Sequence, residues 1–221
     1  MSTTRRPLIG IFGAGKSGVA IARLAVGAGY TVKVASSGNA EDTDQLLRFV
    51  APGAEATDAR KLPTQADVII LALPLRRFRD LPLDALAGRV VIDVMNYWPP
   101  VDGALPEFAD AGRPTSTIVR DALPPTARLV KTFNHLGYHQ MEEFSRRAGA
   151  PDRTALAIAG DDADAVNTVA RIVDDLGFDP VPVGPLTDSD VLEPDGPVFG
   201  QQLDAAAMRQ ALQADGSERA A

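Results

Sequence analysis

The sequence predicts an α/β protein with a doubly wound parallel sheet and a small C-terminal α/β extension. Short apolar runs alternate with segments of helical spacing along the 221 residues, which is the pattern of parallel strands joined by helices. The first apolar run leads directly into a glycine-rich turn, residues 13–18. Apolar residues make up 45% of the chain but aromatic residues only 5%, so we expect an aliphatic core between two layers of helices.

The first sixty residues predict a strand–helix–strand unit. Residues 8–12 (LIGIF) are a buried strand, residues 19–28 have helical spacing, and residues 31–35 (TVKVA) are β-branched enough for a second strand. A helix over 41–50 and a short strand over 54–57 follow. This succession is a βαβ unit.

Three more strands follow in the first part of the chain. Residues 67–73 (DVIILAL) are the clearest strand of the sequence, and Pro74 ends it. Residues 89–94 (RVVIDV) and 128–133 (RLVKTF) are the next two. Each lies between helical or irregular segments, so we expect all of them to be parallel.

The pattern restarts after residue 149. It predicts, in order, a strand over 154–159, a helix over 162–176, a strand over 179–183, a loop over 188–197, a helix over 198–212 and a frayed tail over 215–221. We therefore expect a dinucleotide-binding domain over 1–148, of the kind called a Rossmann domain, with a small C-terminal domain over 149–221 packed on it.

Composition excludes several classes of function. The net charge of −7 argues against nucleic acid as a partner, since that binding needs clustered basic residues. The chain has no cysteine, which excludes disulfides, thiolate catalysis and cysteine-based metal sites. The longest apolar run, 68–74, is too short to span a membrane. The Arg5-Arg6 pair precedes no cleavable apolar segment, so we expect a cytoplasmic protein.

The glycine turn predicts a dinucleotide site. Gly13, Gly15 and Gly18 have the G-x-G-x-x-G spacing between a strand and a helix. The first glycine permits the tight turn, the second lets backbone N–H groups approach a pyrophosphate, and the third lets helix and strand pack closely. The positive end of the helix dipole adds to phosphate binding.

The tip of the second strand favours NADP over NAD. An NAD site usually has a carboxylate there for the ribose 2′-OH, but residues 35–39 read Ala-Ser-Ser-Gly-Asn. We expect Ser36 and Ser37 to donate to a 2′-phosphate. The turn has no arginine, the usual phosphate partner. Lys16 and Lys61 are the two cationic residues that could bind the phosphate instead.

Later motifs resemble one family. The glycine turn, the serine at the second strand tip and Leu73-Pro74 occur in the order seen in F420H2:NADP oxidoreductases. The match continues through Asp93-Val94-Met95-Asn96, Lys131-Thr132-Phe133-Asn134-His135, Gly160-Asp161-Asp162 and Val183-Gly184-Pro185-Leu186. The same reductase domain occurs in membrane metalloreductases, whose membrane part we do not expect here.

The resemblance implies NADP as cofactor and coenzyme F420, or an FMN-like acceptor, as co-substrate. It implies that the hydride passes between the two rings, with no catalytic side chain, and that Asn134 and His135 lie near the rings. We also expect the protein to be a homodimer. Its partner in the reaction would be a small-molecule redox carrier. The cofactor-binding residues would be Gly13, Ala14, Gly15, Lys16, Ser17, Gly18, Ser36, Ser37, Leu73, Pro74, Asn96 and Asn134.

Two other functions stay open. The first is an NADPH-dependent reductase of a small carbonyl or imine, for which Lys131, Tyr138 and His135 are the candidate proton donors. The second is a non-catalytic NADP(H) sensor with a protein partner. A metal site at His135 and His139, spaced i, i+4, lacks a third ligand, so no metal is expected.

Three local features have two readings each. Tyr97 and Trp98 either stack on a flat ring or pack within the protein. Asp161-Asp162 is read as a helix N-cap rather than a catalytic pair. The cluster 76–79 (RRFR) either meets an acidic ligand or forms a solvated surface.

Overall fold

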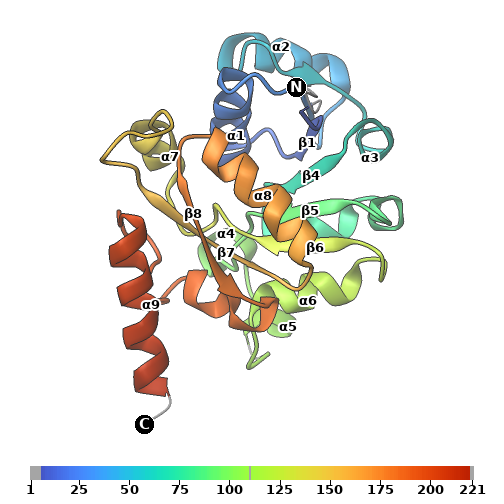
Figure 1. Cartoon of the computed structure of the whole chain (residues 1–221). Coiled ribbons are helices and arrows are strands. Elements are labelled where there is room, and N and C mark those ends of the chain that lie inside the picture. Colours follow the sequence, from blue (N-terminus) through green and yellow to red (C-terminus); the bar gives the residue numbers. More distant parts are fainter. Residues whose placement is uncertain (1–5, 110, 220–221) are drawn as a thin grey trace.

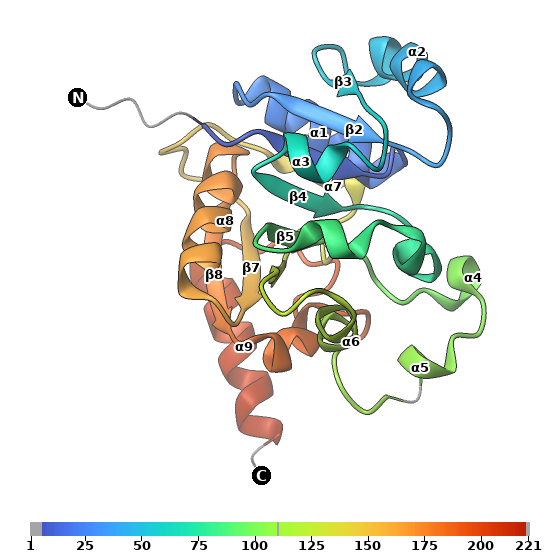
Figure 2. The same cartoon turned by 90° about the vertical axis from the view of Figure 1, so that its right-hand side faces the viewer.

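A computed structural model describes residues 6–109 and 111–219 of the chain. Its described part contains one eight-stranded sheet in the order β3-β2-β1-β4-β5-β6-β7-β8 (Figures 1 and 2). The strands are β1 (Ile9–Phe12), β2 (Val32–Ala35), β3 (Glu55–Ala56), β4 (Val68–Leu71), β5 (Val90–Asp93), β6 (Arg128–Lys131), β7 (Ala155–Gly160) and β8 (Asp179–Gly184). The α/β doubly wound fold predicted from the sequence is confirmed.

Helices cover both faces of the sheet. They are α1 (Lys16–Gly27), α2 (Ala40–Val50), α3 (Leu62–Gln65), α4 (Pro99–Asp102), α5 (Pro106–Ala109), α6 (Thr115–Ala122), α7 (Tyr138–Phe144), α8 (Ala163–Asp175) and α9 (Ala205–Arg219). Three short 3₁₀ helices join them: η1 (Leu75–Asp80), η2 (Leu83–Leu86) and η3 (Leu186–Leu192).

The buried apolar side chains form three clusters, of which the two largest lie on opposite faces of the sheet and the third surrounds β7 and β8. Ile9 and Ile11 of β1 pack with Ile21 of α1 on one face of the sheet. Ile69 and Leu71 of β4 belong to the core of the opposite face, which α3 and α6 cover. Strands buried on both faces have the nearly continuous apolar sequences from which they were predicted.

The chain reverses its direction once within the sheet. β1 to β6 run parallel to their neighbours, β7 pairs antiparallel with β6, and β8 is again parallel to β7. The strands predicted in the first part of the chain are parallel as expected, whereas the antiparallel junction between β6 and β7 was not predicted. The proposed domain boundary at 148/149 stays a prediction, and the sheet is continuous across it.

The helices after β5 differ most from the predictions. The last helix begins at Ala205 rather than at residue 198, since Val198 is buried in the loop before it. Residues 215–219 continue α9 instead of fraying, and residues 220 and 221 lie outside the described part. In Figure 1, α9 extends away from the sheet.

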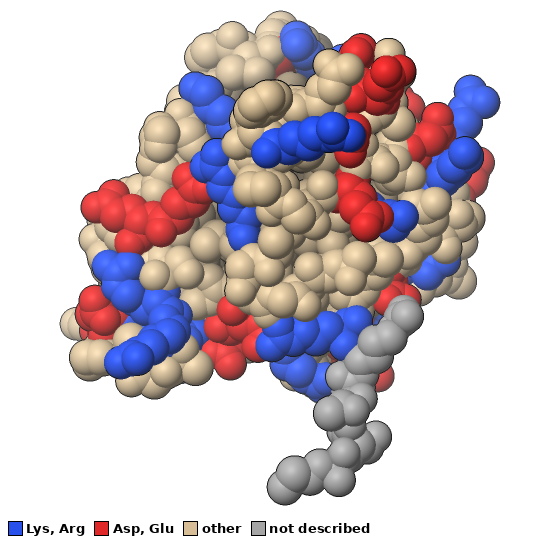
Figure 3. Space-filling view, turned by 90° about the horizontal axis from the view of Figure 1, so that it is seen from above, with Lys and Arg blue, Asp and Glu red and all other residues tan. Residues whose placement is uncertain are grey.

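Basic and acidic residues alternate on the face shown in Figure 3, without a wide area of one sign. In residues 6–109 and 111–219, no helix combines the length and apolar character needed to cross a membrane.

Candidate functional site

A long cleft follows the carboxyl ends of the parallel strands, where the order reverses between β1 and β4. Ligands of doubly wound sheets bind at such a switch point. The cleft has two adjoining hollows of about 620 and 730 Å³, which share Gly15, Ala72, Leu73 and Pro74. The first, here called the β2 hollow, extends to residues 35–46, 58–59 and 77–81. The second, the β6 hollow, extends to residues 94–102, 134–140 and 199–200.

The glycine turn fits the pyrophosphate of a dinucleotide. A Cβ on Gly13 would collide with the Ala72 carbonyl, and one on Gly18 with the Gly13 carbonyl, so these two glycines are required for packing. A Cβ on Gly15 would meet no protein atom within 4 Å. No side chain caps the first turn of α1. Gly15 thus leaves open space beside a helix N-terminus, as close approach of a phosphate requires.

The serines at the tip of β2 are not equivalent. Ser36 Oγ and Thr43 Oγ1 are hydrogen-bonded at 2.7 Å, and Thr43 Oγ1 also lies 2.9 Å from the Asn39 carbonyl. Ser36 Oγ also accepts from the Gly38 N–H at 3.1 Å. Ser36 is therefore engaged within the turn, whereas Ser37 is exposed, and both line the β2 hollow; their contacts with a 2′-phosphate stay predictions.

Four charged residues also line the β2 hollow, of which the sequence analysis had considered only Arg77 as a possible ligand contact, within the cluster 76–79. They are Asp42, Asp58, Arg77 and Asp80. Arg77 Nε donates to Asp80 Oδ2 at 2.5 Å. Asp42 belongs to the first turn of α2, Asp58 follows β3, and Arg77 lies on η1 after β4. Only the fold brings these segments together.

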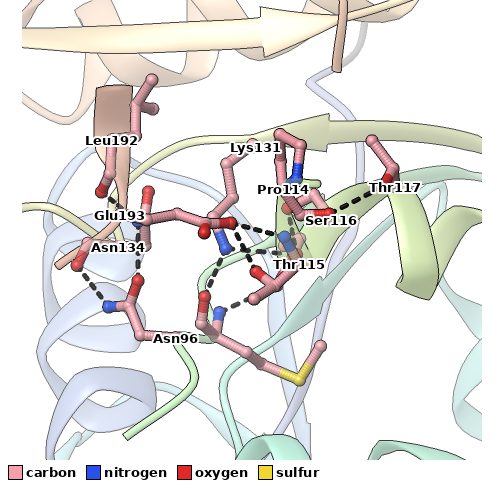
Figure 4. Close-up of polar contacts among 11 residues, drawn as sticks. Asn96, Pro114, Thr115, Ser116, Thr117, Lys131, Asn134, Leu192 and Glu193 are labelled. Carbon is pink, nitrogen blue, oxygen red and sulfur yellow. Dashed lines mark hydrogen bonds and ion pairs between the residues drawn. The ribbon is translucent and has the colours of Figure 1, made fainter. Parts of the chain in front are cut away.

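Two asparagines join neighbouring strand ends in the β6 hollow. Asn96 Nδ2 donates to the Asn134 carbonyl at 2.7 Å, and Asn134 Nδ2 donates to Asn96 Oδ1 at 2.8 Å (Figure 4). Asn134 Nδ2 also donates to the Leu192 carbonyl at 2.6 Å. Asn134 Oδ1 has no partner among the described residues, although it is buried. The pair therefore fixes the strand ends and carries one acceptor without a partner.

A buried ion pair supports this end of the cleft from below. Lys131 Nζ lies 3.3 Å from Asp93 Oδ2, and both side chains are almost fully buried. Lys131 also donates to the Met95 carbonyl, and Asp93 accepts from Ser116 Oγ at 2.7 Å and from the Met95 N–H at 2.8 Å. The pair thereby holds the backbone next to Asn96 (Figure 4).

His135 is fully buried and neutral. Its Nε2 accepts from the Ala157 N–H at 3.2 Å, so the proton is on Nδ1, which has no partner among the described residues. Burial, and to a lesser extent the nearby Lys131, lowers the pKa of His135 to about 3. It cannot act as an acid near neutral pH.

His135 and His139 do not share a helix face, because α7 begins only at Tyr138. His139 is exposed on that helix. In residues 6–109 and 111–219, no group of three or more His, Asp or Glu residues could hold a metal ion.

The mouth of the β6 hollow is apolar. Trp98 and Val101 line it and are 46% and 50% exposed. Tyr97 instead stacks on Phe108 with ring centroids 6.2 Å apart, so it packs within the protein. Lys16 Nζ lies 5.1 Å from the ring centroid of Tyr138, and both residues line the hollow.

Comparison with known proteins shows which family this cleft resembles. The sequence profile of the family described as NADP oxidoreductase, coenzyme F420-dependent, matches residues 8–97. This segment contains the glycine turn, the tip of β2 and the Leu73-Pro74 corner. Residues 8–97 are therefore similar to this family of NADP-dependent oxidoreductases. The resemblance predicted from the sequence is confirmed.

Similar proteins extend the match beyond residue 97. The metalloreductase STEAP3 of Rattus norvegicus is 27% identical over 190 residues, which are 85% of this chain and 36% of that protein. The chain thus spans about a third of that relative.

Two solved structures share the fold. The hypothetical protein SMa0349 of Sinorhizobium meliloti has a TM-score of 0.74 at 25% identity, covering 89% of this chain and 94% of that one. A proposed F420-dependent NADP reductase of Arthrobacter sp. FB24 has a TM-score of 0.62 at 20% identity, covering 83% and 87%.

The predicted cofactor residues meet in one cleft. Eleven of the twelve line it, and Gly18 packs behind the turn instead. Their contacts with NADP stay predictions. Arg77, Trp98 and Val101 also line the cleft, and no specific role had been assigned to any of the three. Trp98 was one of two aromatic candidates, and Arg77 belonged to a cluster with two readings.

Proposed function

We propose that this protein transfers a hydride between NADP(H), bound along the glycine turn, and a flat redox carrier in the β6 hollow. The carrier is coenzyme F420 or a related flavin. The observation behind this proposal is the second hollow itself, which adjoins the nucleotide turn, has an apolar mouth and offers few groups able to give a proton. Such a site suits two cofactors that bring their own redox chemistry and need only alignment and exclusion of water.

Different residues along the cleft would bind different parts of the two cofactors. Gly13 to Ser17 would hold the pyrophosphate, and the Asn96–Asn134 pair would orient the nicotinamide end through its free acceptor. Trp98 and Val101 would cover the carrier ring. The bound nicotinamide supplies a hydride, and the carrier takes it up together with one proton from water.

Lys16 supports an anionic carrier. The β6 hollow contains two charged residues in its described lining, Lys16 and Asp102. Asp102 is buried and accepts from the backbone N–H groups of Arg76 and Trp98 at 3.1 and 2.9 Å. The charge available to a ligand is therefore that of the Lys16 ammonium, which suits a phosphate-bearing carrier.

A small carbonyl or imine is the second candidate substrate, and Tyr138 is the observation in its favour. Lys131 is fully buried in its ion pair and His135 is neutral. Of the three proton donors considered, Tyr138 alone remains, at the mouth of the hollow beside Lys16.

The deciding experiment mixes the protein with NADPH and F420 and follows the loss of oxidised F420 absorbance. NADH, FMN and 1-pyrroline are tested in parallel, and the Tyr138→Phe and Trp98→Ala variants are compared. We expect F420 reduction that Tyr138→Phe retains and Trp98→Ala slows. Turnover of 1-pyrroline alone, abolished in Tyr138→Phe, would establish the second candidate. NADPH binding without reduction of any acceptor would contradict both and leave a sensor.

We propose further that the protein is a cytoplasmic homodimer whose contact includes α9, the helix that extends from the sheet (Figure 1). Size-exclusion chromatography with light scattering tests this. A dimer that becomes monomeric when the chain ends before Asp204 is the expected result, and a monomeric full-length chain contradicts it.

A further inference from the structure

Arg77 is the one cationic residue in the described lining of the β2 hollow. It is 46% exposed and lies on η1, the 3₁₀ helix that follows the Pro74 corner. Leu75 and Phe78 of the same helix are buried, at 1% exposure each. These two anchors hold η1 against the core and leave Arg77 at the cleft.

The neighbouring arginine has a different environment. Arg79 Nη2 lies 2.7 Å from Glu107 Oε2, and its guanidinium lies over the Phe78 ring at 4.8 Å. Arg79 does not line the β2 hollow. It therefore provides a matched control for Arg77 in charge, exposure and helix.

The charges around Arg77 make its role specific. Asp42, Asp58 and Asp80 line the same hollow, so without Arg77 this lining would carry three carboxylates and no cation. Such a lining would repel a 2′-phosphate, which carries up to two negative charges. A ribose 2′-OH has no charge and would not be repelled.

The Arg77 guanidinium has N–H groups that are available to a ligand. Its Nε is bonded to Asp80 at 2.5 Å, while its two terminal amino groups have no hydrogen-bond partner among the described residues. Asp42 accepts from Asn39 Nδ2 at 2.9 Å, and Asp58 accepts from the Arg60 N–H at 2.8 Å, and neither carboxylate is hydrogen-bonded to Arg77. A guanidinium with a free edge can bind a phosphate through two parallel hydrogen bonds.

We propose that Arg77 binds the 2′-phosphate of NADP(H) together with Ser37, and that Arg77 thereby sets the preference for NADP(H) over NAD(H). The inference rests on the proposed function only in that a dinucleotide occupies the cleft; it does not depend on which acceptor takes the hydride. The arginine missing from the β2 tip is thus supplied by the segment after β4.

The test is equilibrium binding, without an acceptor. NADPH and NADH are titrated by fluorescence, and 2′,5′-ADP by calorimetry, on the wild-type chain and on Arg77→Ala, Arg77→Lys, Asp80→Asn and Arg79→Ala. We expect Arg77→Ala to lower the affinity for NADPH and for 2′,5′-ADP by about 10- to 100-fold, which is the effect of losing hydrogen bonds to a charged group. The affinity for NADH should change by less than about twofold, because NADH has no 2′-phosphate for Arg77 to bind.

The other variants sharpen the result. Arg77→Lys keeps the charge without the fork, so its loss should be smaller than that of Arg77→Ala. Asp80→Asn removes a competing carboxylate and should leave 2′,5′-ADP binding as tight as in the wild type or tighter. Arg79→Ala should leave the affinity for both nucleotides unchanged. Thermal melting of each variant checks that the half-exposed substitutions leave the fold intact.

Equal weakening of NADPH and NADH in Arg77→Ala would overturn the inference, because Arg77 would then contact a part that the two nucleotides share. Unchanged NADPH affinity would overturn it as well. A selective loss of 2′,5′-ADP binding supports the inference even if no acceptor is reduced, in which case the proposed function fails and the assignment of Arg77 holds.

Discussion

The imidazole of His135 accepts a hydrogen bond from the backbone N–H of Ala157 at 3.2 Å. This bond links the end of β6 to β7, across the antiparallel junction of the sheet. It requires the neutral imidazole, because a protonated ring has no acceptor. The residue that the sequence analysis placed near the reacting rings is therefore also a structural connection.

Acid should weaken the fold through His135. The unfolded chain binds a proton to this imidazole near pH 6.5, whereas the folded chain does so only near its lowered pKa of about 3. Between these values the unfolded state carries more protons, so stability is complete above about pH 6.5 and is lost as the pH falls. The slope from this group is at most about 1.4 kcal/mol per pH unit.

Urea denaturation between pH 7.5 and 5 measures this slope. His135→Gln should show a shallower loss than the wild type, while His139→Gln, at an exposed position, should keep the wild-type slope. An identical slope in the wild type and His135→Gln would mean that the folded imidazole titrates normally.

The glycine turn should separate nucleotide binding from folding. In Gly15→Ala the new methyl group meets no protein atom, so stability should fall by no more than about 1 kcal/mol, from the helix N-cap. NADPH binding should fall at least about tenfold, because the methyl group occupies the place of the pyrophosphate.

Gly18→Ala is the matched variant. Its methyl group would collide with the Gly13 carbonyl, so we expect a loss of about 2–3 kcal/mol in unfolding free energy. Thermal denaturation and NADPH titration of both variants check the contrast. Equal destabilisation by the two substitutions would disprove the distinct roles assigned to the glycines.

Removing Lys131 should be among the most costly single changes in the sheet. Lys131→Met leaves Asp93 charged, buried and without its cation, and such a change typically costs about 3–5 kcal/mol. The double variant Lys131→Met/Asp93→Asn removes both charges and should be more stable than Lys131→Met alone.

An exposed ion pair provides the comparison. Arg113 Nη1 and Asp121 Oδ2 are 2.7 Å apart, and both side chains are 46% exposed. Arg113→Met should therefore cost less than about 1 kcal/mol. Urea denaturation of all variants tests the ranking, and a similar cost for Lys131→Met and Arg113→Met would contradict it.

Asn134→Ala should slow hydride transfer without affecting the nucleotide end of the cleft. The substitution removes the bonds to Asn96 and to the Leu192 carbonyl, so the strand ends beside the rings lose their alignment. We expect the single-turnover rate of NADPH oxidation to fall by about 10- to 100-fold, with unchanged affinity for 2′,5′-ADP.

Gln140→Ala is the matched amide variant, since Gln140 lines the same hollow but bonds to the Gly137 N–H. It should retain most of the rate. A loss of 2′,5′-ADP binding in Asn134→Ala would show that the two ends of the cleft are not independent.

The sequence predicted the sheet well because its strands are buried on both faces. Residues 68–71 and 90–93 have almost no polar side chain, and strong local patterns of this kind survive in the fold. Asp162 also behaves as predicted: it caps α8 by accepting from the Ala165 N–H at 2.7 Å. Local hydrogen bonds of this kind can be predicted from neighbouring residues alone.

Features that depend on distant segments could not be predicted in this way. The last helix was placed seven residues too early, because Val198 and Phe199 continue its apolar pattern but are held in the preceding loop by the core and the β6 hollow. The position of Arg77 depends on the turn after β4 and on the tip of β2, which lie more than thirty residues apart. The hydrogen bond between Ser36 and Thr43 depends on rotamers, which no sequence pattern indicates.

The reversed direction of β7 has a consequence for how such a protein can diversify. After β8 the chain must return across the sheet, and it reaches Asn134 only at Leu192. The nucleotide end of the cleft is therefore encoded within about the first hundred residues, whereas part of the opposite wall comes from Phe199 and Gly200. Under the proposed function, changes in that late segment would alter which second substrate is accepted while the nucleotide half stays the same, so one inherited scaffold would acquire new partners by varying a single short stretch of chain.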